Sequence, residues 1–366
     1  MAIKAAIDIG TFNSEIYVPG KGLLLRYGAN EKDENAYQTP SVIARYIAPP
    51  RKVIAVGQQA YDMMGRVPPG IEIVKAVKAG RIHDPDAFVN IVTHQIGLAF
   101  PNFKPQSALK WMTQEKIQIV ISVPCNATPN EIREIRRLLK WKGRDEVFLV
   151  SQPIAAAIGA DLNFRGITAC AILDIGGGTS DLGVLCSGKK VFADSLEDLG
   201  GDLINKHIVE MLRDRYRLII GDHKAEVIKR QLGSTRSTKE RLTLDVDGRS
   251  VDTNAPETKT ICNDDVRDVI IEVLNKIVDG LMRLLDDIPY HDQGVEIHGD
   301  IKKNGIWLTG GGSLIEGCAD FLSEKTGLII QPVKDPLLSV INGTAEILKD
   351  KSLLEEFSIT QHSLAS

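Results

Sequence analysis

Two stretches half a chain apart share one pattern of apolar and polar positions. Residues 4–18 read KAAIDIGTFNSEIYV and residues 170–184 read CAILDIGGGTSDLGV, so that Asp8 matches Asp174 at a constant offset (174 − 8 = 166). In each copy an apolar strand runs into Asp-Ile-Gly and a second apolar strand follows, which predicts a β-hairpin with a tight polar turn. An internal repeat of this kind predicts two similar domains, each presenting one such turn.

The rest of the apolar pattern alternates between strands and helices, which indicates an α/β chain. Apolar runs predict strands at 117–123, 147–150 and 306–309. Helical periodicity, with Thr128 as an N-cap followed by Pro129, predicts helices at 129–141, 153–159, 202–219, 222–232, 264–288 and 313–325. The polar segments 28–40 and 234–258 are predicted to be irregular, exposed insertions.

Composition limits the class of protein. The 366 residues include 44 Lys and Arg against 48 Asp and Glu, a net charge of −4, which excludes a broadly basic nucleic-acid binder. No apolar run approaches the ~18 residues of a membrane span, and the N-terminus lacks a signal-peptide pattern, so we expect a cytoplasmic protein. Five cysteines without a CxxC pair predict free thiols rather than zinc ligands or disulfides.

Three glycine-rich turns each follow a predicted strand. We name them turn 1 (residues 8–13, DIGTFN), turn 2 (174–179, DIGGGT) and turn 3 (309–313, TGGGS). Glycines let backbone N–H groups approach phosphate oxygens closely. A carboxylate at the start of two such turns would repel phosphate unless a divalent cation bridged the two, and Mg²⁺ favours such ligands. Three turns of this kind favour a nucleotide site over plain tight turns.

Two other nucleotide-binding motifs do not fit. The chain has no GxxxxGK[ST] sequence, which excludes a P-loop. A GxGxxG that starts at Gly176 is incomplete, because Asp181 stands where the last glycine belongs, and this disfavours a Rossmann dinucleotide site.

The two DIG stretches and WLTGGGSLIEG resemble the phosphate 1, phosphate 2 and adenosine motifs of the actin, sugar-kinase and heat-shock-chaperone superfamily. Within it the chain is most similar to the MreB-type bacterial actins, over almost its whole length, including VPCNATPNEIREIRRLLK and EVFLVSQPIAAAIGA. The resemblance implies a two-lobed actin-like α/β ATPase, each lobe a duplicated mixed-sheet domain, with ATP or ADP and Mg²⁺ in a cleft between the lobes. Lobe I would comprise 1–155 and 335–366, with a small outer subdomain at 30–75. Lobe II would comprise 156–334, with one at 200–258.

The resemblance also implies a set of site residues. Asp8 and Asp174 would organise Mg²⁺ through water, and Gln152 would act with them in catalysis. Without the resemblance, Glu226 and Lys229 would be read as a solvated helix face. The residues implied in ATP binding are Gly10, Thr11, Phe12, Asn13, Gly176, Gly177, Gly178, Thr179, Gly201, Asp202, Glu226, Lys229, Thr309, Gly310, Gly311 and Gly312.

Departures from the family pattern bear on the expected role. MreB proteins usually carry Glu-Glu-Pro where this chain has Ser151-Gln152-Pro153, and segments 31–38 and 102–115 are longer than is typical. A divergent paralogue of the cell-shape filament is therefore one hypothesis. A MamK-like filament that positions organelles, a plasmid-segregating filament and a non-polymerising chaperone-type ATPase switch are the alternatives.

The expected function is a slow Mg-dependent ATPase that polymerises into cell-shape filaments, with other copies of itself as its main partner. The inner membrane surface and membrane-anchored morphogenesis or organelle proteins are further candidate partners; direct contact with nucleic acid is not expected. Aromatic side chains beside lysines suit a membrane interface, which singles out Phe100, Phe103 and Trp111. Packing of these side chains onto lobe I is an equally weighted alternative.

Overall fold

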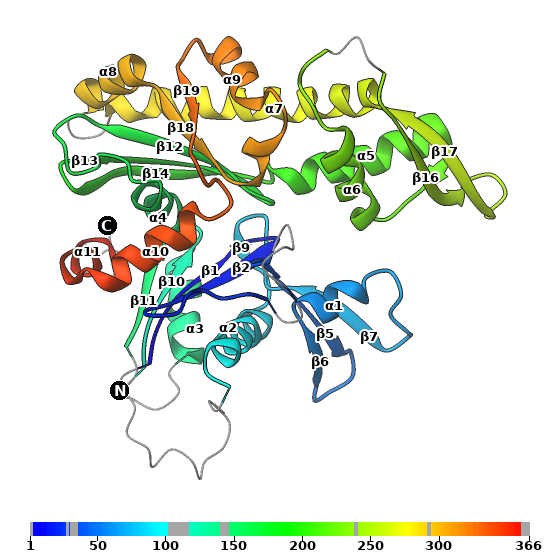
Figure 1. The fold of residues 1–366 in the computed structure, drawn as a ribbon, viewed down its shortest axis with the longest axis horizontal. Coiled ribbons are helices and arrows are strands. Elements are labelled where there is room, and N and C mark those ends of the chain that lie inside the picture. Colours follow the sequence, from blue (N-terminus) through cyan, green and yellow to red (C-terminus); the bar gives the residue numbers. More distant parts are fainter. Residues whose placement is uncertain are drawn as a thin grey trace. The chain divides into compact units, whose positions relative to one another are not determined.

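The computed structural model describes residues 3–26, 29, 36–101, 117–139, 146–237, 241–290 and 294–359. The chain divides into two compact units. Unit 1 comprises Met1–Ile167, Gly183–Asp194 and Leu337–Ser366; unit 2 comprises Thr168–Leu182 and Ser195–Pro336. Each unit is described by itself below, with the labels of Figure 1.

The main sheet of unit 1 contains the first predicted hairpin. Its order is β11-β10-β1-β2-β3, and β4 pairs with β2 at the side. Strand β1 pairs antiparallel with β2 and parallel with β10, which pairs parallel with β11. The hairpin and the predicted strand at 117–123 are thus confirmed. The bounds are β1 (Ile3–Ile9), β2 (Asn13–Val18), β3 (Gly22–Leu23), β4 (Thr39–Pro40), β10 (Ile117–Val123) and β11 (Glu146–Ser151).

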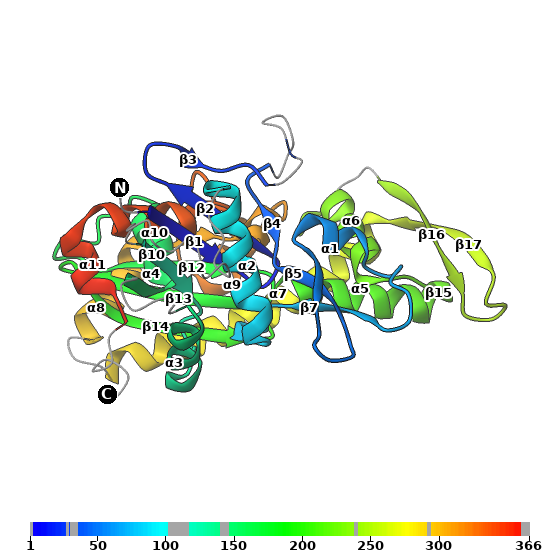
Figure 2. The same cartoon turned by 90° about the horizontal axis from the view of Figure 1, so that it is seen from below.

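Helices cover both faces of this sheet, which is why its central strands are almost wholly apolar (Figures 1 and 2). One face packs on α2 (Pro85–Ala99) and α3 (Pro129–Leu138), the other on α4 (Gln152–Gly159) and α10 (Ser339–Lys349), and α11 (Lys351–Phe357) follows α10. Thr128 caps α3 in a capping box with Glu131, as predicted, and positions 140 and 141 lie outside the described residues. Helices α4 and α10 cross closely, because a Cβ on Gly159 or Gly343 would collide with the backbone of the other helix.

The outer part of unit 1 is a small sheet of order β6-β5-β7. It joins the main sheet through β4, the short strand beside β2. Its elements, with a two-stranded ribbon that follows them, are β5 (Val42–Tyr46), β6 (Val53–Val56), α1 (Gln58–Asp62), β7 (Ile71–Lys75), β8 (Val77–Lys78) and β9 (Arg81–Ile82).

The main sheet of unit 2 repeats the topology of the first. Its order is β14-β13-β12-β18-β19, with β18 parallel to both β12 and β19, as β10 is to β1 and β11. The sequence repeat therefore corresponds to a repeat of strand order. Its strands are β12 (Cys170–Ile175), β13 (Thr179–Cys186), β14 (Lys189–Glu197), β18 (Ile306–Thr309) and β19 (Ile330–Pro332), and the part from Gly183 to Asp194 is counted with unit 1.

The other elements of unit 2 are helices and a second, three-stranded sheet of order β15-β16-β17 (Figure 1). The strands are β15 (Leu218–Ile219), β16 (Thr243–Ser250) and β17 (Pro256–Cys262). The helices are α5 (Gly201–Tyr216), α6 (Asp222–Leu232), α7 (Asn263–Asp287), α8 (Gly294–Asn304) and α9 (Cys318–Thr326), with 3-10 turns η1 (Ile288–Tyr290) and η2 (Gly311–Leu314).

Two predicted helices were wrong at their ends. The helix expected at 202–219 ends at Tyr216, because Arg217 takes a left-handed conformation (φ 55°) and the next two residues form β15. The helix expected at 313–325 is divided, because Gly317 (φ 76°) separates η2 from α9.

The prediction of irregular insertions was also wrong. Segment 234–258 contains β16 and the start of β17, whose cross-strand pairs are partly polar. Thr260 Oγ1 donates to Asp245 at 2.6 Å, and Thr258 Oγ1 donates to Asp247 at 2.8 Å. Because these polar pairs stand where apolar pairs are usual, the alternation of apolar and polar residues that marks a strand is weak in β16 and β17. The described part of 28–40 likewise includes β4.

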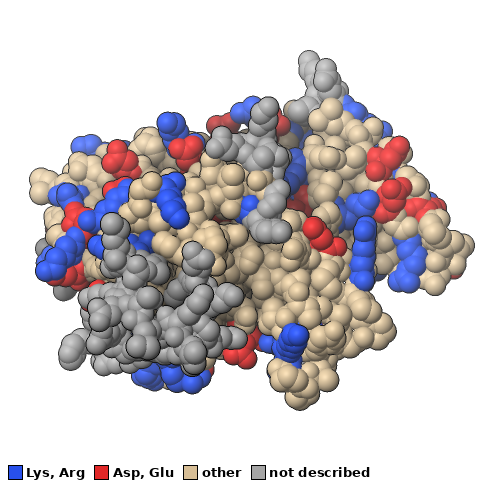
Figure 3. Space-filling view, turned by 60° about the horizontal axis from the view of Figure 1, so that its bottom comes forward, with Lys and Arg blue, Asp and Glu red and all other residues tan. Residues whose placement is uncertain are grey.

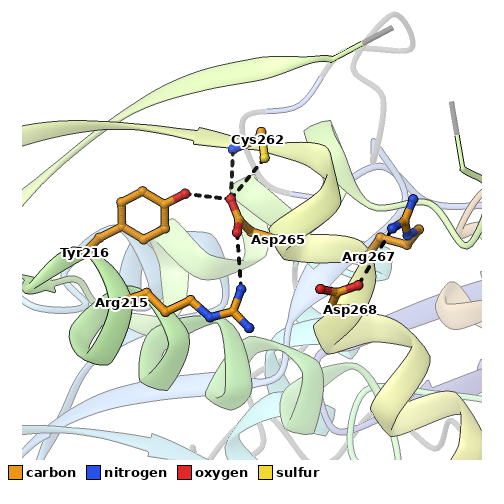
Figure 4. Close-up of polar contacts among 6 residues, drawn as sticks. All are labelled: Arg215, Tyr216, Cys262, Asp265, Arg267 and Asp268. Carbon is orange, nitrogen blue, oxygen red and sulfur yellow. Dashed lines mark hydrogen bonds and ion pairs between the residues drawn. The ribbon is translucent and has the colours of Figure 1, made fainter. Parts of the chain in front are cut away.

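A carboxylate ties the start of α7 to the end of α5 (Figure 4). Asp265 Oδ2 accepts hydrogen bonds from the Tyr216 hydroxyl at 2.6 Å and from the Cys262 thiol at 3.0 Å, and Arg215 lies 3.2 Å from Oδ1. Burial alone would raise the pKa of Asp265, but these hydrogen bonds hold it below its usual value. Burial and the bond to Asp265 raise the pKa of Tyr216 to about 12. This cluster fixes the outer end of α5, whose other end helps to form the site below.

The surface and the cysteines agree with the composition. On the face drawn in Figure 3, Lys and Arg side chains are interspersed with Asp and Glu. All five cysteines are free thiols, as predicted. In the described ranges, no helix combines the length and the apolar character needed to cross a membrane.

Candidate functional site

Turn 1 lies at the carboxyl edge of the main sheet of unit 1. It joins β1 to β2, and Gly10 N–H donates to the Asn13 carbonyl at 2.8 Å. Strands β1, β10 and β11 run parallel, so residues at their carboxyl ends gather at one edge, where α/β sheets commonly bind ligands. Three polar residues meet there: Asp8 of β1, Ser122 of β10, and Gln152 at the start of α4.

The Asp8 carboxylate is buried and held by two side-chain donors. The Ser122 hydroxyl and the Gln152 amide both donate to Asp8 Oδ1, the latter at 3.1 Å. Burial raises the pKa of Asp8, and these hydrogen bonds offset part of the rise. A nearby cation would stabilise the charged form of such a carboxylate. Asp8 is therefore chemically suited to a magnesium ion with its shell of water.

The Gln152 side chain has a fixed orientation. Its Nε2 lies 3.1 Å from Asp8 Oδ1 and 3.2 Å from the Ile9 carbonyl oxygen. Both partners are acceptors, so the NH₂ group must face them and Oε1 must face away. Oε1 is thus presented as an acceptor, which is what the positioning of a water molecule requires.

Turn 2 lies against the N-terminus of α5 in unit 2. Gly201 N–H donates to the Gly176 carbonyl at 3.0 Å, and Asp202 N–H donates to the Gly177 carbonyl at 2.7 Å. A Cβ on Gly200 would come within 2.8 Å of both carbonyl oxygens, so this approach requires glycine. Gly178 and Thr179 are buried, and the Thr179 hydroxyl donates to Asp181 at 3.2 Å.

Glu226 and Lys229 of α6 join the same cluster. Lys229 Nζ lies 2.6 Å from Glu226 Oε2 and donates to the Gly201 carbonyl at 3.2 Å. Asn205 and Arg230 also donate to Glu226. Burial would raise the pKa of Glu226, but the Lys229 charge and these donors lower it to about 2. The pair is largely buried, not a solvated helix face.

Turn 3 lies beside Asp174, the first residue of turn 2. Asp174 pairs with Thr309 in the register of β12 and β18. Gly310 has a left-handed φ of 82°, and a Cβ there would collide with Asp174 Oδ1 and the Ile175 carbonyl; one on Gly312 would collide with the Ile175 side chain. The Thr309 hydroxyl is buried and donates to the Pro336 carbonyl at 3.1 Å, so it is engaged within the protein.

Unit 2 thus brings together turn 2, turn 3 and the predicted residues of α5 and α6, while unit 1 gathers turn 1 with Gln152. The sequence profile of the MreB/Mbl protein family matches residues 2–356. The chain belongs to the MreB/Mbl family. Its relatives include the cell shape-determining protein MreB of Escherichia coli K12, 33% identical over 94% of this chain and 92% of the relative. Another is Mbl of Bacillus subtilis 168, which is 30% identical over 95% of this chain and 96% of the relative.

Solved structures show that this MreB/Mbl chain has the actin-like fold predicted for it. MreB5 of Spiroplasma citri bound to AMPPNP is 27% identical, with a TM-score of 0.81 over 97% of this chain and 98% of that one. The same protein bound to ADP gives a TM-score of 0.82 over the same shares. A MamK double helical filament, 18% identical, has the same fold, with a TM-score of 0.70 over 95% of this chain and 99% of that one.

A magnesium ion fits the donors that are present. Among the described residues, no group of three or more His, Cys, Asp or Glu side chains is arranged to hold a metal ion by itself. Mg²⁺ commonly uses only one or two carboxylates together with water and phosphate oxygens. The missing Cβ of Gly310 leaves space beside Asp174 Oδ1, where an ion or its water could lie.

Sequence reasoning missed several residues around turn 1. Ser122 is fully buried in an apolar strand, and only the register of β1 with β10 brings it to Asp8. Glu15 is 3% exposed and pairs with Asp8 across β1 and β2; Gln38 hydrogen-bonds both Glu15 and Asn13. For Glu15 the internal repeat offered one clue. Asp181 occupies the matching position in the second copy, 166 residues later, and is also a buried carboxylate.

We expect Glu15→Gln to stabilise the nucleotide-free MreB/Mbl chain by about 1 kcal/mol at neutral pH. Burial and repulsion from Asp8 raise the pKa of Glu15 well above its usual value, with the Gln38 hydrogen bond offsetting part of the rise. The folded state therefore binds more protons than the unfolded state, so this group lowers stability as pH rises from about 4.5 through the folded-state pKa.

Denaturant unfolding from pH 4 to 8 measures this effect. As pH rises, the free energy of unfolding should decrease less in the Glu15→Gln variant than in the wild type. Glu324→Gln, at an exposed position, should match the wild type. A variant that is less stable than wild type at pH 7.5 would show that the charged form of Glu15 supports the fold.

Proposed function

We propose that this MreB/Mbl chain is an adenine-nucleotide-dependent filament protein that hydrolyses ATP slowly. The observation that carries the proposal is the glycine cluster of unit 2, where Gly176, Gly177, Gly200 and Gly201 bring turn 2 against the start of α5. Backbone N–H groups within a glycine-rich turn of this kind suit phosphate. The AMPPNP and ADP in the MreB5 structures support an adenine nucleotide as the ligand.

Each unit contributes its own residues to this function. In unit 1, Gly10, Thr11, Phe12 and Asn13 of turn 1 bind phosphate. In unit 2, Gly176, Gly177, Gly178 and Thr179 bind phosphate, while Gly201, Asp202, Glu226, Lys229 and the backbone of turn 3 form the adenosine side. Asp8 and Asp174 would each offer a carboxylate to the waters of magnesium, and the ion would supply charge neutralisation on the phosphates.

Binding of nucleotide is the direct test of this proposal. Isothermal titration of the purified chain with ATP and with ADP, each with and without Mg²⁺, should show saturable binding that magnesium strengthens. GTP serves as the comparison for base preference. Absence of binding of either adenine nucleotide at millimolar concentration would contradict the proposed function.

Filament formation and cellular role follow from the family. The relatives are named for determining cell shape, and we propose that this chain assembles with copies of itself for the same purpose. Exposed apolar residues Tyr46 and Ile47, 47% and 53% exposed at the end of β5, offer area that a second copy would cover. A filament that positions organelles or plasmids would use the same nucleotide chemistry and would differ from a cell-shape filament in its partners.

The membrane loop remains a prediction from the sequence. Phe103 and Trp111 lie outside the described residues. Phe100 is half-buried against the core of unit 1, with Lys21 Nζ 5.1 Å from its ring centroid. For Phe100 this favours the packing alternative.

We expect Gln152→Ala to lower phosphate release by roughly tenfold or more, because the attacking water loses an orienting acceptor. ATP binding and filament formation should persist, and filaments should disassemble more slowly because ATP stays intact. Gln152→Glu should turn over at least as fast as wild type, since a carboxylate can accept a proton.

Phosphate release from filaments at matched protein concentration measures this effect. Gln331→Ala, in β19 of unit 2, is a control that should release phosphate at the wild-type rate. Equal release by Gln152→Ala and wild type would show that Gln152 only begins α4 and has no role in hydrolysis.

A further inference from the structure

Gln38 joins two polar side chains of β2 from just before the neighbouring strand β4. It is buried, and its Oε1 accepts a hydrogen bond from Asn13 Nδ2 at 3.1 Å. Its side chain also hydrogen-bonds the carboxyl group of Glu15. We propose that Gln38 is a positioning residue, which orients the Asn13 side chain for a phosphate group of the nucleotide. This inference rests on the proposed function, in which Asn13 of turn 1 binds phosphate.

The two hydrogen bonds of Gln38 fix the direction of its amide and of the Asn13 amide. The bond from Gln38 opposes the rise in the pKa of Glu15, which is the effect of a donor on a carboxylate, so Gln38 Nε2 faces Glu15. Gln38 Oε1 then faces Asn13 and can only accept, so Asn13 turns its NH₂ group toward it. Rotating the Asn13 amide by half a turn would bring two oxygens together.

Asn13 is placed to use this orientation. It is the last residue of turn 1, where its carbonyl closes the turn by accepting from Gly10 N–H at 2.8 Å, and it is partly exposed. The two N–H groups of an amide lie in one plane, so the bond to Gln38 also sets the direction of the second N–H. A donor that is already oriented loses less side-chain freedom on binding, a saving of about 2–10-fold in affinity.

The backbone that carries Gln38 is itself held against β2. Thr39, the next residue, pairs with Ser14 in the register of β4 and β2, and Ser14 Oγ donates to the Thr39 carbonyl at 3.1 Å. Gln95 of α2 is 1% exposed and donates to Ser14 Oγ at 2.9 Å and to the Ser14 carbonyl at 3.0 Å. The Gln38 side chain therefore extends from a fixed strand, as the orientation of a partner requires.

The alternative is that Gln38 only supplies a donor to the buried Glu15. Loss of Gln38 would then leave ATP affinity unchanged, or would lower it through the fold to the same extent whether or not Asn13 is present. Positioning predicts instead that the effect of Gln38 on ATP binding depends on Asn13. A double-mutant cycle on the two residues separates these roles.

Isothermal titration of the full chain with Mg-ATP, up to millimolar nucleotide, measures this cycle. Gln38→Met keeps the length of the side chain but removes its donor and acceptor, and should weaken ATP binding by about 2–10-fold. Asn13→Ala should weaken it by roughly tenfold or more. In the Asn13→Ala background, Gln38→Met should add less than about a twofold change, because no amide is left to orient. Gln59→Met, at an exposed glutamine of α1, is the matched control and should bind as wild type.

Two results would overturn the inference while leaving the proposed function intact. One is wild-type ATP affinity in Gln38→Met. The other is an equal loss from Gln38→Met with and without Asn13, since Gln38 would then act through the fold. Absence of ATP binding by wild type would remove the proposed function and this inference together.

A second background keeps the test decisive if Gln38→Met does not fold. In Glu15→Gln, no buried carboxylate loses its donor when Gln38 is replaced. The cycle is then measured with Glu15→Gln as the reference chain, and the same losses are expected and the same results would overturn the inference.

Discussion

Replacing Asp174 with alanine is expected to abolish Mg-dependent ATP hydrolysis, with a fall of about 10³-fold or more, and to weaken Mg-ATP binding. Asp174 opens turn 2 and lies beside Gly310 of turn 3, so its carboxylate is where magnesium and its waters would be anchored. Binding of ATP without magnesium should change much less, because the phosphate-binding glycines remain.

Phosphate release and nucleotide titration, each with and without Mg²⁺, separate these effects. Asp268→Ala, at an exposed position of α7, removes a carboxylate without touching the turns and should behave as wild type. Full turnover in the Asp174→Ala variant would refute its assignment to magnesium.

Gly310→Ala is expected to lower nucleotide affinity by roughly 100-fold and to destabilise unit 2 by about 2–4 kcal/mol. The new Cβ would carry a left-handed φ of 82° and would also collide with Asp174 Oδ1 and the Ile175 carbonyl. Turn 2 and turn 3 would have to separate, and this separation would move the Asp174 carboxylate.

Gly327→Ala is a matched control for backbone strain. Gly327 has a φ of 70°, but a Cβ there would meet no atom within 4 Å, so it reports the cost of left-handed backbone alone, about 1 kcal/mol. Equal effects of the two substitutions on nucleotide affinity would show that the contact between turn 3 and Asp174 does not matter for binding.

The repeated hairpin was visible in the sequence because it combines two strong signals, the constant offset and the Asp-Ile-Gly turn. The strands at 117–123 and 306–309 were visible because buried parallel strands are continuous apolar runs. By contrast, β16 and β17 replace apolar pairs with Thr–Asp pairs, and a polar strand looks like a loop in a hydropathy pattern.

The polar surroundings of the turns could not be predicted from local patterns. Ser122 reaches Asp8 only through the register of two strands more than 100 residues apart, and Gln38 reaches Asn13 across β2 and β4. Glu226 and Lys229 appeared solvated, since helical periodicity does not reveal that the start of α5 covers them. Such contacts depend on tertiary packing, which leaves no trace in residue spacing.

Electron microscopy of the purified chain with Mg-ATP, with Mg-ADP and without nucleotide tests whether this chain forms filaments that depend on ATP. We predict filaments with Mg-ATP for wild type and for Gln152→Ala, and few or none for Asp174→Ala or without nucleotide. Single particles under every condition, from protein that binds Mg-ATP in titrations, would contradict this prediction and would favour a non-polymerising ATPase switch.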